Sequence, residues 1–318
     1  MDRNFIQSLE SIAHHIDQEY FDEKIAGQVA SRLRMQMTEG RYDKIASIQE
    51  LSEFVTRDLY AWTQDKHLAV SVIAANTTNS SSSRPSESRE VMARRSNFGI
   101  QRVEILGGNV GYFQLTSFYR PEEASEAIAS AMKLLQHADA LIFDLRDNGG
   151  GSPDTVVLVA SYLLGKPNLS LFTIHPRSGP SNRVYQTAEV DAWDREGNRP
   201  IFVLTSQRTF SGGEGMAFLL QEHQKAVVIG EQTAGAANPG RPYPINDRLE
   251  VTVPNGQIRS SVSGGNWEGK GVVPNIAMAS EDAFQVAYRH ALRHLIQKTS
   301  DEAWQAKLKE HLQQLDAK

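Results

Sequence analysis

Three nearly all-apolar segments restrict the fold of this 318-residue chain more than any other feature. They cover residues 140–145, 201–205 and 226–229, and segments with helical spacing of apolar residues separate them. A strand without alternating polar residues is buried on both faces, and strands separated by helices usually pair in parallel. The pattern therefore predicts an α/β fold with a largely parallel sheet that helices cover on both sides.

Periodic apolar residues and turn residues predict the other elements of this region. A Gly107-Gly108-Asn109 turn joins the two strands of an expected hairpin, residues 103–106 and 110–118. The expected helices are residues 122–137, 155–164, 213–223, 281–297 and 302–315. We expect these elements to form one domain over residues 100–318, with helices at its C-terminal end.

The beginning of the chain has a different pattern. Apolar residues between Phe5 and Trp62 recur at helical spacing, which predicts about three helices and no strand. Ser47 followed by Glu50 three residues later is typical of a capping box at the start of a helix. We therefore expect an N-terminal helical domain over residues 1–72.

A polar segment separates the two regions. Residues 67–72 favour a short strand that closes the helical domain. Residues 76–86 consist of asparagine, threonine, serine, arginine and proline, and such a segment cannot bury apolar surface. We expect a polar linker over residues 73–99.

The composition excludes several classes of site and partner. The chain has no cysteine, which excludes disulfides, thiolate metal sites and a cysteine nucleophile. Its 33 basic and 38 acidic residues give a net charge of −5, which argues against a protein that follows nucleic-acid phosphates. No stretch reaches the roughly 18 apolar residues of a membrane helix. The N-terminus lacks a secretory-signal pattern, so the expected compartment is the cytoplasm as written, or the periplasm or exterior if a signal was removed.

Three glycines follow the first apolar segment, in Asp144-Leu145-Arg146-Asp147-Asn148-Gly149-Gly150-Gly151-Ser152-Pro153. Glycines adopt positive φ and let a substrate approach backbone N–H groups, which can face a developing negative charge. The structural alternative is a tight turn from strand to helix, and a glycine run alone favours that alternative. No Gly-Lys-Ser/Thr follows, so the segment is not a phosphate-binding loop.

A serine stands between the second apolar segment and the next expected helix. Ser211 lies near the positive end of that helix dipole, and the N–H of Gly212 can donate to an oxyanion formed on attack by Ser211. The alternative is that Ser211 is only an N-cap, with Glu214 completing a capping box. Both interpretations fit the same residues. Thr209 and Gly213 flank the serine, so the segment is not the Gly-x-Ser-x-Gly elbow of the α/β-hydrolases.

A serine nucleophile needs a base at neutral pH, and the histidines are the first candidates. Seven of the nine lie on expected helices, and His175 lies in an expected loop. His67 stands at the junction of the helical region and a strand, although its position alone favours a structural role. Glu268 in the glycine-rich segment 264–275 could orient a histidine, although alone it is an ordinary loop glutamate.

Five motifs in this order together resemble the C-terminal processing, or tail-specific, peptidase family. They are His67, Asp144-Leu145-Arg146-x-Asn148-x-Gly150-Gly151, Thr209-x-Ser211-x-x-Glu214, Gly230-Glu231-x-Thr233-x-Gly235 and Trp267-Glu268-Gly269-x-Gly271-Val272-x-Pro274. The match spans most of residues 50–280. The resemblance implies a spiral ββα core related to the ClpP and crotonase folds, attached to an N-terminal helical bundle.

The family has two catalytic designs, and this chain resembles one of them. The tail-specific design pairs the serine with a lysine in the Gly-Glu-x-Thr-x-Gly-Lys segment, where this chain has Ala236. The other design is similar to tricorn protease and to bacterial relatives of interphotoreceptor retinoid-binding protein. It uses a histidine from the N-terminal region and a glutamate before Gly-x-Gly-Val, and His67 and Glu268 match these positions.

The resemblance thus implies a catalytic arrangement without a Ser-Lys dyad. Ser211 attacks the carbonyl, His67 transfers the proton and Glu268 orients the imidazole. The backbone N–H groups expected to hold the oxyanion are those of Gly212 and of Gly150 or Gly151.

The chain departs from the family pattern in two places. Lys66 precedes His67, where the tricorn-like site has a serine. About 35 residues separate Val72 from Gly107, which is too few for the PDZ domain that many members carry. The resulting organisation resembles a single module of the retinoid-binding-protein type.

The expected function is a serine-type peptidase that acts on peptide or protein substrates and requires no metal or organic cofactor. An alternative from another class is a binding module of the same fold for an apolar ligand such as a retinoid or fatty acid. A third is an inactive scaffold in which Ser211 only caps its helix. The oligomeric state is left open.

Overall fold

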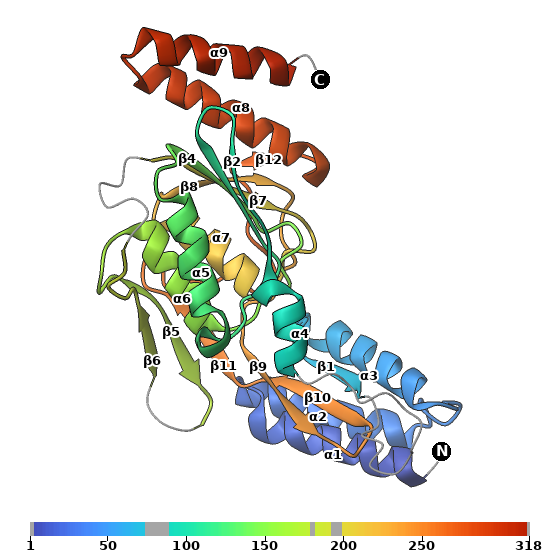
Figure 1. Cartoon of the computed structure of the whole chain (residues 1–318). Coiled ribbons are helices and arrows are strands. Elements are labelled where there is room, and N and C mark those ends of the chain that lie inside the picture. Colours follow the sequence, from blue (N-terminus) through green and yellow to red (C-terminus); the bar gives the residue numbers. More distant parts are fainter. Residues whose placement is uncertain (1–2, 74–88, 179–181, 192–198, 317–318) are drawn as a thin grey trace. The chain divides into compact units, whose positions relative to one another are not determined.

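The chain divides into two compact units, each assembled from separate parts of the sequence. The computed structural model describes residues 3–73, 89–178, 182–191 and 199–316 (Figure 1). Unit 1 comprises residues 1–86, 173–183 and 236–259, and unit 2 comprises residues 87–172, 184–235 and 260–318. The N-terminal helices therefore share their unit with two later segments of the chain.

Unit 1 combines three helices with a three-stranded antiparallel sheet. The helices are α1 (Arg3–Glu19), α2 (Glu23–Thr38) and α3 (Ile48–Thr63), and the strands in sheet order are β1 (Ala69–Val72), β10 (Leu249–Pro254) and β9 (Gly240–Pro244). The three helices and the strand that follows them were predicted correctly. Ser47 is the N-cap of α3, and its hydroxyl accepts a hydrogen bond from the Glu50 N–H at 3.1 Å. The Glu50 carboxylate accepts from the N–H of Ala46, one residue before the cap.

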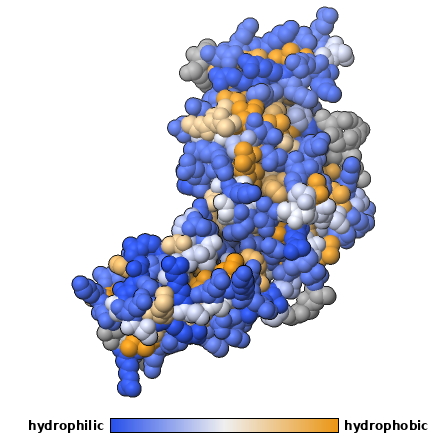
Figure 2. Space-filling model, turned by 180° about the vertical axis from the view of Figure 1, so that it is seen from behind, coloured by the Kyte–Doolittle hydropathy of each residue, from blue (hydrophilic) through white to orange (hydrophobic). Residues whose placement is uncertain are grey.

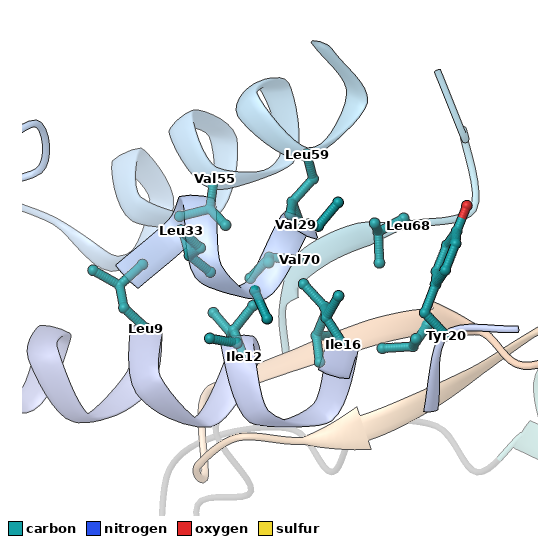
Figure 3. Close-up of a cluster of buried hydrophobic side chains, with 14 of the residues drawn as sticks. Leu9, Ile12, Ile16, Tyr20, Val29, Leu33, Val55, Leu59, Leu68 and Val70 are labelled. Atoms are coloured by element: carbon teal, nitrogen blue, oxygen red, sulfur yellow. The ribbon is translucent and has the colours of Figure 1, made fainter. Parts of the chain in front are cut away.

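The core of unit 1 forms between the helices and the sheet (Figure 3). Ile12, Leu33 and Leu59, one from each helix, are fully buried in it. Leu249 and Val251 of β10 are also fully buried in this cluster. The helical periodicity predicted the helical half of this core. The strand half combines Val70 of β1 with residues of β10, which come much later in the chain.

Unit 2 is built around a six-stranded sheet with the order β12-β8-β7-β4-β3-β2. All neighbours pair in parallel except β2 and β3, which form the predicted hairpin. The strands are β2 (Ile100–Leu106), β3 (Val110–Leu115), β4 (Ala140–Asp144), β7 (Ile201–Thr205), β8 (Ala226–Gly230) and β12 (Ile276–Ala277). The largely parallel sheet expected from the three apolar segments is confirmed.

Helices lie on both faces of this sheet (Figure 1). The helices are α5 (Pro121–Leu135), α6 (Pro153–Leu164), α7 (Gly212–Glu222), α8 (Ser280–Lys298) and α9 (Glu302–Asp316). On one face, α8 and α9 share a buried cluster with strand residues that include Val110, Ile142 and Leu204. On the other face lie α5, α6 and α7. Every residue of β4 and β7 is buried, as expected for strands covered on both sides, and the α/β class is confirmed.

A third sheet was not predicted from the sequence. It has the order β11-β5-β6, with β5 (Ser170–Pro176), β6 (Arg183–Gln186) and β11 (Gly256–Ser260). The expectation that His175 lies in a loop was wrong, because this residue belongs to β5. These short strands have polar ends near prolines and glycines, so their sequences resemble loops. They form strands because segments that are distant in the sequence pair with each other.

The predicted polar linker falls largely on residues 74–88, outside the described residues. Of its remainder, Arg89–Arg95 form helix α4 and Asn97–Gly99 form a single 3₁₀ turn. The division into residues 1–72, 73–99 and 100–318 stays a prediction. The compact units add that residues 173–183 and 236–259 group with the N-terminal helices.

Hydrophilic side chains predominate on the face shown in Figure 2, with hydrophobic ones among them. Within the described ranges, none of the helices combines the length and apolar character needed to cross a membrane.

The contact between α8 and the sheet predicts a large difference between two identical substitutions in unit 2. Leu292 of α8 is fully buried, whereas Leu134 of α5 is 54% exposed. We expect Leu292→Ala to lower the free energy of unfolding by about 2–5 kcal/mol, because it leaves a cavity, and Leu134→Ala by less than about 0.5 kcal/mol. Urea unfolding followed by circular dichroism measures both, and similar losses for the two variants would contradict the packing described.

Candidate active site

Two loops meet at one edge of the unit 2 sheet, after the parallel neighbours β4 and β7. The Thr209 hydroxyl donates to the Leu145 carbonyl at 2.8 Å, and the Phe210 N–H donates to the Asn148 carbonyl at 2.9 Å. Asn148 is fully buried, and its side-chain amide donates to a carbonyl of β3. The glycine-rich loop and the loop that carries the candidate nucleophile are therefore fixed to each other.

The glycine run has both structural features considered from the sequence. It forms a turn, and it lets neighbouring parts of the chain come close to its backbone. Gly150 and Gly151 have φ values of 94° and 134°, which side-chain-bearing residues rarely adopt. A Cβ atom on Gly150 would lie 2.7 Å from the Cβ of Ser211, and one on Gly151 would lie 2.2 Å from the carbonyl oxygen of Phe118. Only glycine fits at these two positions.

The amides of this loop differ in their hydrogen bonds. The N–H of Gly150 donates to the side-chain oxygen of Asn148 at 2.8 Å. Within the described part of the chain, the N–H groups of Gly151 and Gly212 donate to no other protein atom. A Cβ atom on Gly212 would lie 3.2 Å from the nitrogen of Gly151, so these two amides are close to each other.

Ser211 has a strained backbone conformation directly before α7. It is the N-cap of α7, with φ of 50° and ψ of −116°. An N-cap residue normally has an extended backbone, as Ser47 does at the start of α3 with φ of −137° and ψ of 157°. A conformation of the Ser211 kind costs about 1–3 kcal/mol and persists only where the surroundings enforce it. Capping alone does not explain this geometry, whereas a serine presented on a sharp strand-to-helix turn is a known form of nucleophile.

Glu214 completes the capping box and also does more than the sequence suggested. One carboxylate oxygen accepts from the Ser211 N–H at 2.8 Å. The other accepts from the Thr233 hydroxyl and from the Gly235 N–H, both at 2.6 Å. The side chain is fully buried. The sequence analysis considered Glu214 as a capping partner and as part of the Thr209-x-Ser211-x-x-Glu214 motif. It did not predict the contact of Glu214 with the Thr233-x-Gly235 motif.

The loop that carries Glu268 is attached to the same part of unit 2. The Gly269 N–H donates to the Gly235 carbonyl at 3.0 Å, and the ring of the buried Trp267 lies 5.2 Å from that of Phe218 in α7. Glu268 is partly buried, and its N–H donates to the Asn266 side chain at 3.0 Å. The Glu268 loop is thus positioned by α7 and by the loop after β8.

His67 belongs to unit 1, between α3 and β1. Its N–H donates to a carboxylate oxygen of Asp65 at 2.9 Å, and the other oxygen of Asp65 accepts from the Tyr20 hydroxyl at 3.0 Å. Desolvation lowers the pKa of His67 to about 4, and burial raises the pKa of Asp65. The imidazole is therefore neutral at pH 7 and able to accept a proton.

The residues expected to act together thus come from both units. Ser211, Glu268 and the glycine amides belong to unit 2, and His67 belongs to unit 1. Their joint arrangement stays a prediction. Ala236, at the position where the tail-specific design has its lysine, is fully buried. Among the described residues, no three histidine, aspartate or glutamate side chains are grouped in a way that could hold a metal ion.

Comparison with known families decides where this chain belongs. The model described as Peptidase family S41 matches residues 109–278, which is more than half of the chain. The chain belongs to peptidase family S41. A second model, described as the N-terminal domain of peptidase S41 in eukaryotic IRBP, matches residues 1–100 of this S41 chain. The resemblance inferred from the five motifs is confirmed.

Curated S41 relatives are longer proteins. The carboxyl-terminal-processing protease of Synechocystis is 33% identical over 149 residues, which are 46% of this chain and 33% of the relative. The carboxy-terminal processing protease CtpA of Bacillus subtilis is 26% identical over 193 residues, 59% of this chain and 39% of the relative. The chain thus spans about a third of the length of these relatives.

Solved structures share the fold over nearly the whole chain. A putative peptidase from Parabacteroides merdae has a TM-score of 0.60 at 17% identity and covers 95% of this chain and 99% of its own. The photosystem II D1 C-terminal processing protease has a TM-score of 0.52 at 17% identity, covering 88% and 94%. The tricorn protease has a TM-score of 0.50 at 13% identity, covering 98% of this chain and 37% of its own. At these identities the likeness is one of fold.

The close approach of Gly150 to Ser211 predicts a difference between two neighbouring glycines. Gly149→Ala meets no atom within 4 Å of the new methyl group, whereas Gly150→Ala forces a methyl group against Ser211 at a positive φ. We expect Gly150→Ala to lower the free energy of unfolding by about 1–3 kcal/mol and Gly149→Ala to have little effect. The measurement is the urea midpoint of unfolding of each variant. Equal midpoints would show that Gly150 lies farther from Ser211 than described.

Proposed function

We propose that this S41 chain is a serine-type peptidase with Ser211 as its nucleophile. The observation that carries the proposal is the strained conformation of Ser211 at the start of α7, beside the amides of Gly151 and Gly212. Such an arrangement presents a hydroxyl at a turn and keeps donors near the place where negative charge forms. A helix cap has no need of this strain.

The reaction follows from the roles of these groups. Ser211 Oγ attacks the scissile carbonyl while His67 takes its proton, and His67 then gives the proton to the leaving amine. A water molecule, activated by His67, attacks the acyl group and releases Ser211. Glu268 orients the imidazole and stabilises its positive charge.

The amides of Gly151 and Gly212 are assigned to the oxyanion. The sequence offered Gly150 as an equal candidate, but the Gly150 N–H is used by Asn148. In this proposal Gly150 allows the loop to approach Ser211 and does not donate to the substrate. Removing one oxyanion donor typically costs about 10²–10³ in turnover.

His67 is the proposed base because the lysine of the other design is absent. The methyl side chain of Ala236 can neither accept nor donate a proton. The neutral imidazole of His67 can accept one at pH 7. The proposal requires units 1 and 2 to bring His67 within about 2.6–3.2 Å of the Ser211 hydroxyl when substrate is bound.

The proposed substrates are peptides or proteins. Several relatives are named as proteases that process carboxyl termini. We extend this activity to the present chain, with a peptide bond near a substrate C-terminus as the first substrate to test.

Binding of an apolar ligand is the second candidate function, and the match of residues 1–100 to the IRBP N-terminal model favours it. A cavity of about 690 Å³ lies in unit 1 between the starts of α1 and α3 and the turn between β9 and β10. Most of its lining residues are polar, including Asn246, Asp247 and Arg248, whereas sites for apolar ligands are mostly lined by apolar side chains. Saturable binding of retinol, followed by fluorescence, without hydrolysis of any peptide would favour this candidate.

Labelling with a fluorophosphonate tests the peptidase proposal. We expect the wild-type protein to be labelled at Ser211 and Ser211→Ala to lose all labelling. His67→Ala and Glu268→Ala should slow labelling by several orders of magnitude, with the larger loss for His67, because the base takes part in every proton transfer. Mass spectrometry of the labelled peptide and the rate of labelling are the measurements.

A matched control is Ser261→Ala, which removes an exposed serine hydroxyl from the same unit. This variant should react at the wild-type rate. Equal labelling of wild type and Ser211→Ala would reject Ser211 as the nucleophile.

The lowered pKa of His67 predicts the acid limit of activity. His67 must be neutral to act as a base, so labelling should persist from pH 7 to about pH 5 and be lost as the pH falls through about 4. An exposed histidine would give a midpoint near 6.5. Since folded His67 binds its proton more weakly than unfolded His67, this residue's contribution to stability is also lost between pH 6.5 and 4.

The labelling rate is therefore measured across this range together with circular dichroism at each pH. A midpoint near 6.5 in folded protein would argue against a desolvated His67 as the base. His67→Ala should lack this transition.

A further inference from the structure

Glu214 is a buried carboxylate that contacts both the candidate nucleophile and another loop. It has no exposed surface, and its two oxygens point to different partners. One accepts from the Ser211 N–H at 2.8 Å. The other accepts from the Thr233 hydroxyl and the Gly235 N–H at 2.6 Å each. Hydrogen bonds to an ionised carboxylate are stronger than those between neutral groups.

A capping box explains only one of these two oxygens. In such a box the glutamate at the third helical position accepts from the N-cap N–H, which is the bond to Ser211. At α3 the corresponding glutamate is the solvent-accessible Glu50, whose carboxylate accepts from the Ala46 N–H, one residue before the Ser47 cap. Burial of Glu214 and the use of its second oxygen by the loop after β8 need a further reason.

The second oxygen leads to the loop that carries Glu268. The Thr233 hydroxyl that donates to Glu214 also accepts from the Val272 N–H at 2.7 Å. The Gly235 carbonyl accepts from the Gly269 N–H at 3.0 Å. Two short paths of hydrogen bonds thus run from Glu214 to residues on either side of Gly271. Gly271 itself has φ of 74°, and a Cβ atom there would collide with the Thr233 carbonyl.

We propose that Glu214 is a positioning residue that holds Ser211 in its strained conformation and fixes the Glu268 loop to the same carboxylate. This inference rests on the proposed peptidase function. The Glu214 side chain thereby keeps the position of the Ser211 backbone fixed relative to the loop that carries Glu268. The Glu214 carboxylate accepts from the Ser211 backbone N–H, and the proposed reaction gives it no proton to transfer.

A carboxylate is required at this place by the donors around it. Ser211 and Gly235 offer N–H groups and Thr233 offers its hydroxyl, so both oxygens must accept. A glutamine has one accepting oxygen and one NH₂ group, and its NH₂ would face a donor on one side. Glu214→Gln therefore keeps the size of the side chain and breaks one of the two connections.

The test compares Glu214→Gln with Glu222→Gln, the same change at the other end of α7. Glu222 accepts from the Ser260 hydroxyl, and Ser260 lies outside the loops that carry Ser211 and Glu268. The measurements are the rate constant for fluorophosphonate labelling per folded molecule and the melting temperature. For hydrolysis of fluorescein-labelled casein, kcat and KM are determined separately.

We expect Glu214→Gln to lower the labelling rate constant and kcat by about 100-fold with little change in KM, because a small displacement of the nucleophile has an effect of this size. Glu222→Gln should stay within about 2-fold of wild type. A purely structural role would change the melting temperature and the folded fraction, and would leave the rate constant of folded molecules unchanged. A folded Glu214→Gln with the wild-type rate constant overturns the inference.

Thr233→Val keeps the inference testable if Glu214→Gln does not fold. It removes the hydroxyl that joins Glu214 to Val272 and leaves the Glu214 carboxylate in place. We expect a loss of about 10-fold in labelling rate, and a wild-type rate in this folded variant overturns the inference. Failure of the underlying function is recognised separately, because wild type itself would then not be labelled at Ser211, and the inference would fall with it.

Discussion

Parallel pairing of β4 with β7 is the constraint on which the candidate site depends. Asp144, at the end of β4, lies in register with Leu204 near the end of β7, so the two loops leave the sheet side by side. Loops after adjacent parallel strands open at the same edge of a sheet, which is where α/β proteins usually bind ligands. The hydrogen bonds of Asn148 and Thr209 across the two loops, and the approach of Gly150 to Ser211, are possible only in this register.

Two buried carboxylates near this edge are stabilised in different ways. Asp144 forms a bidentate ion pair with Arg146 and accepts from the Tyr112 hydroxyl at 2.6 Å. The hydrogen bond to Asp144 raises the pKa of Arg146, and burial raises the pKa of Tyr112. Arg146 also donates to the Ser280 carbonyl at the start of α8, which connects the edge of the sheet to the helix layer. Glu214 accepts from a hydroxyl and two backbone amides instead. The ion pair joins secondary structure elements, whereas the Glu214 bonds fix the path of loops.

The sequence predicted those elements whose apolar pattern is local. Helical periodicity and unbroken apolar runs identified α5 to α9 and the parallel strands β4, β7 and β8 of unit 2 within a few residues, but not α4 or β12. The sequence did not predict β9. Its Gly-Arg-Pro-Tyr-Pro sequence resembles a turn, and it becomes a strand only by pairing with β10. For the site, the residue types at Ser211 and Glu214 fitted a cap and a nucleophile equally. No sequence pattern reports the positive φ value of Ser211, which supports the proposed nucleophile.

The composition of unit 1 has a consequence for how such a chain can be divided or rearranged during evolution. The boundary of the N-terminal family model at residue 100 does not coincide with a boundary of folding, since Leu249 and Val251 of β10 complete the core around α1, α2 and α3. A gene segment that encodes only the helices would leave an apolar face uncovered. The helical region therefore needs the β10 segment, far later in the chain, to form a complete core.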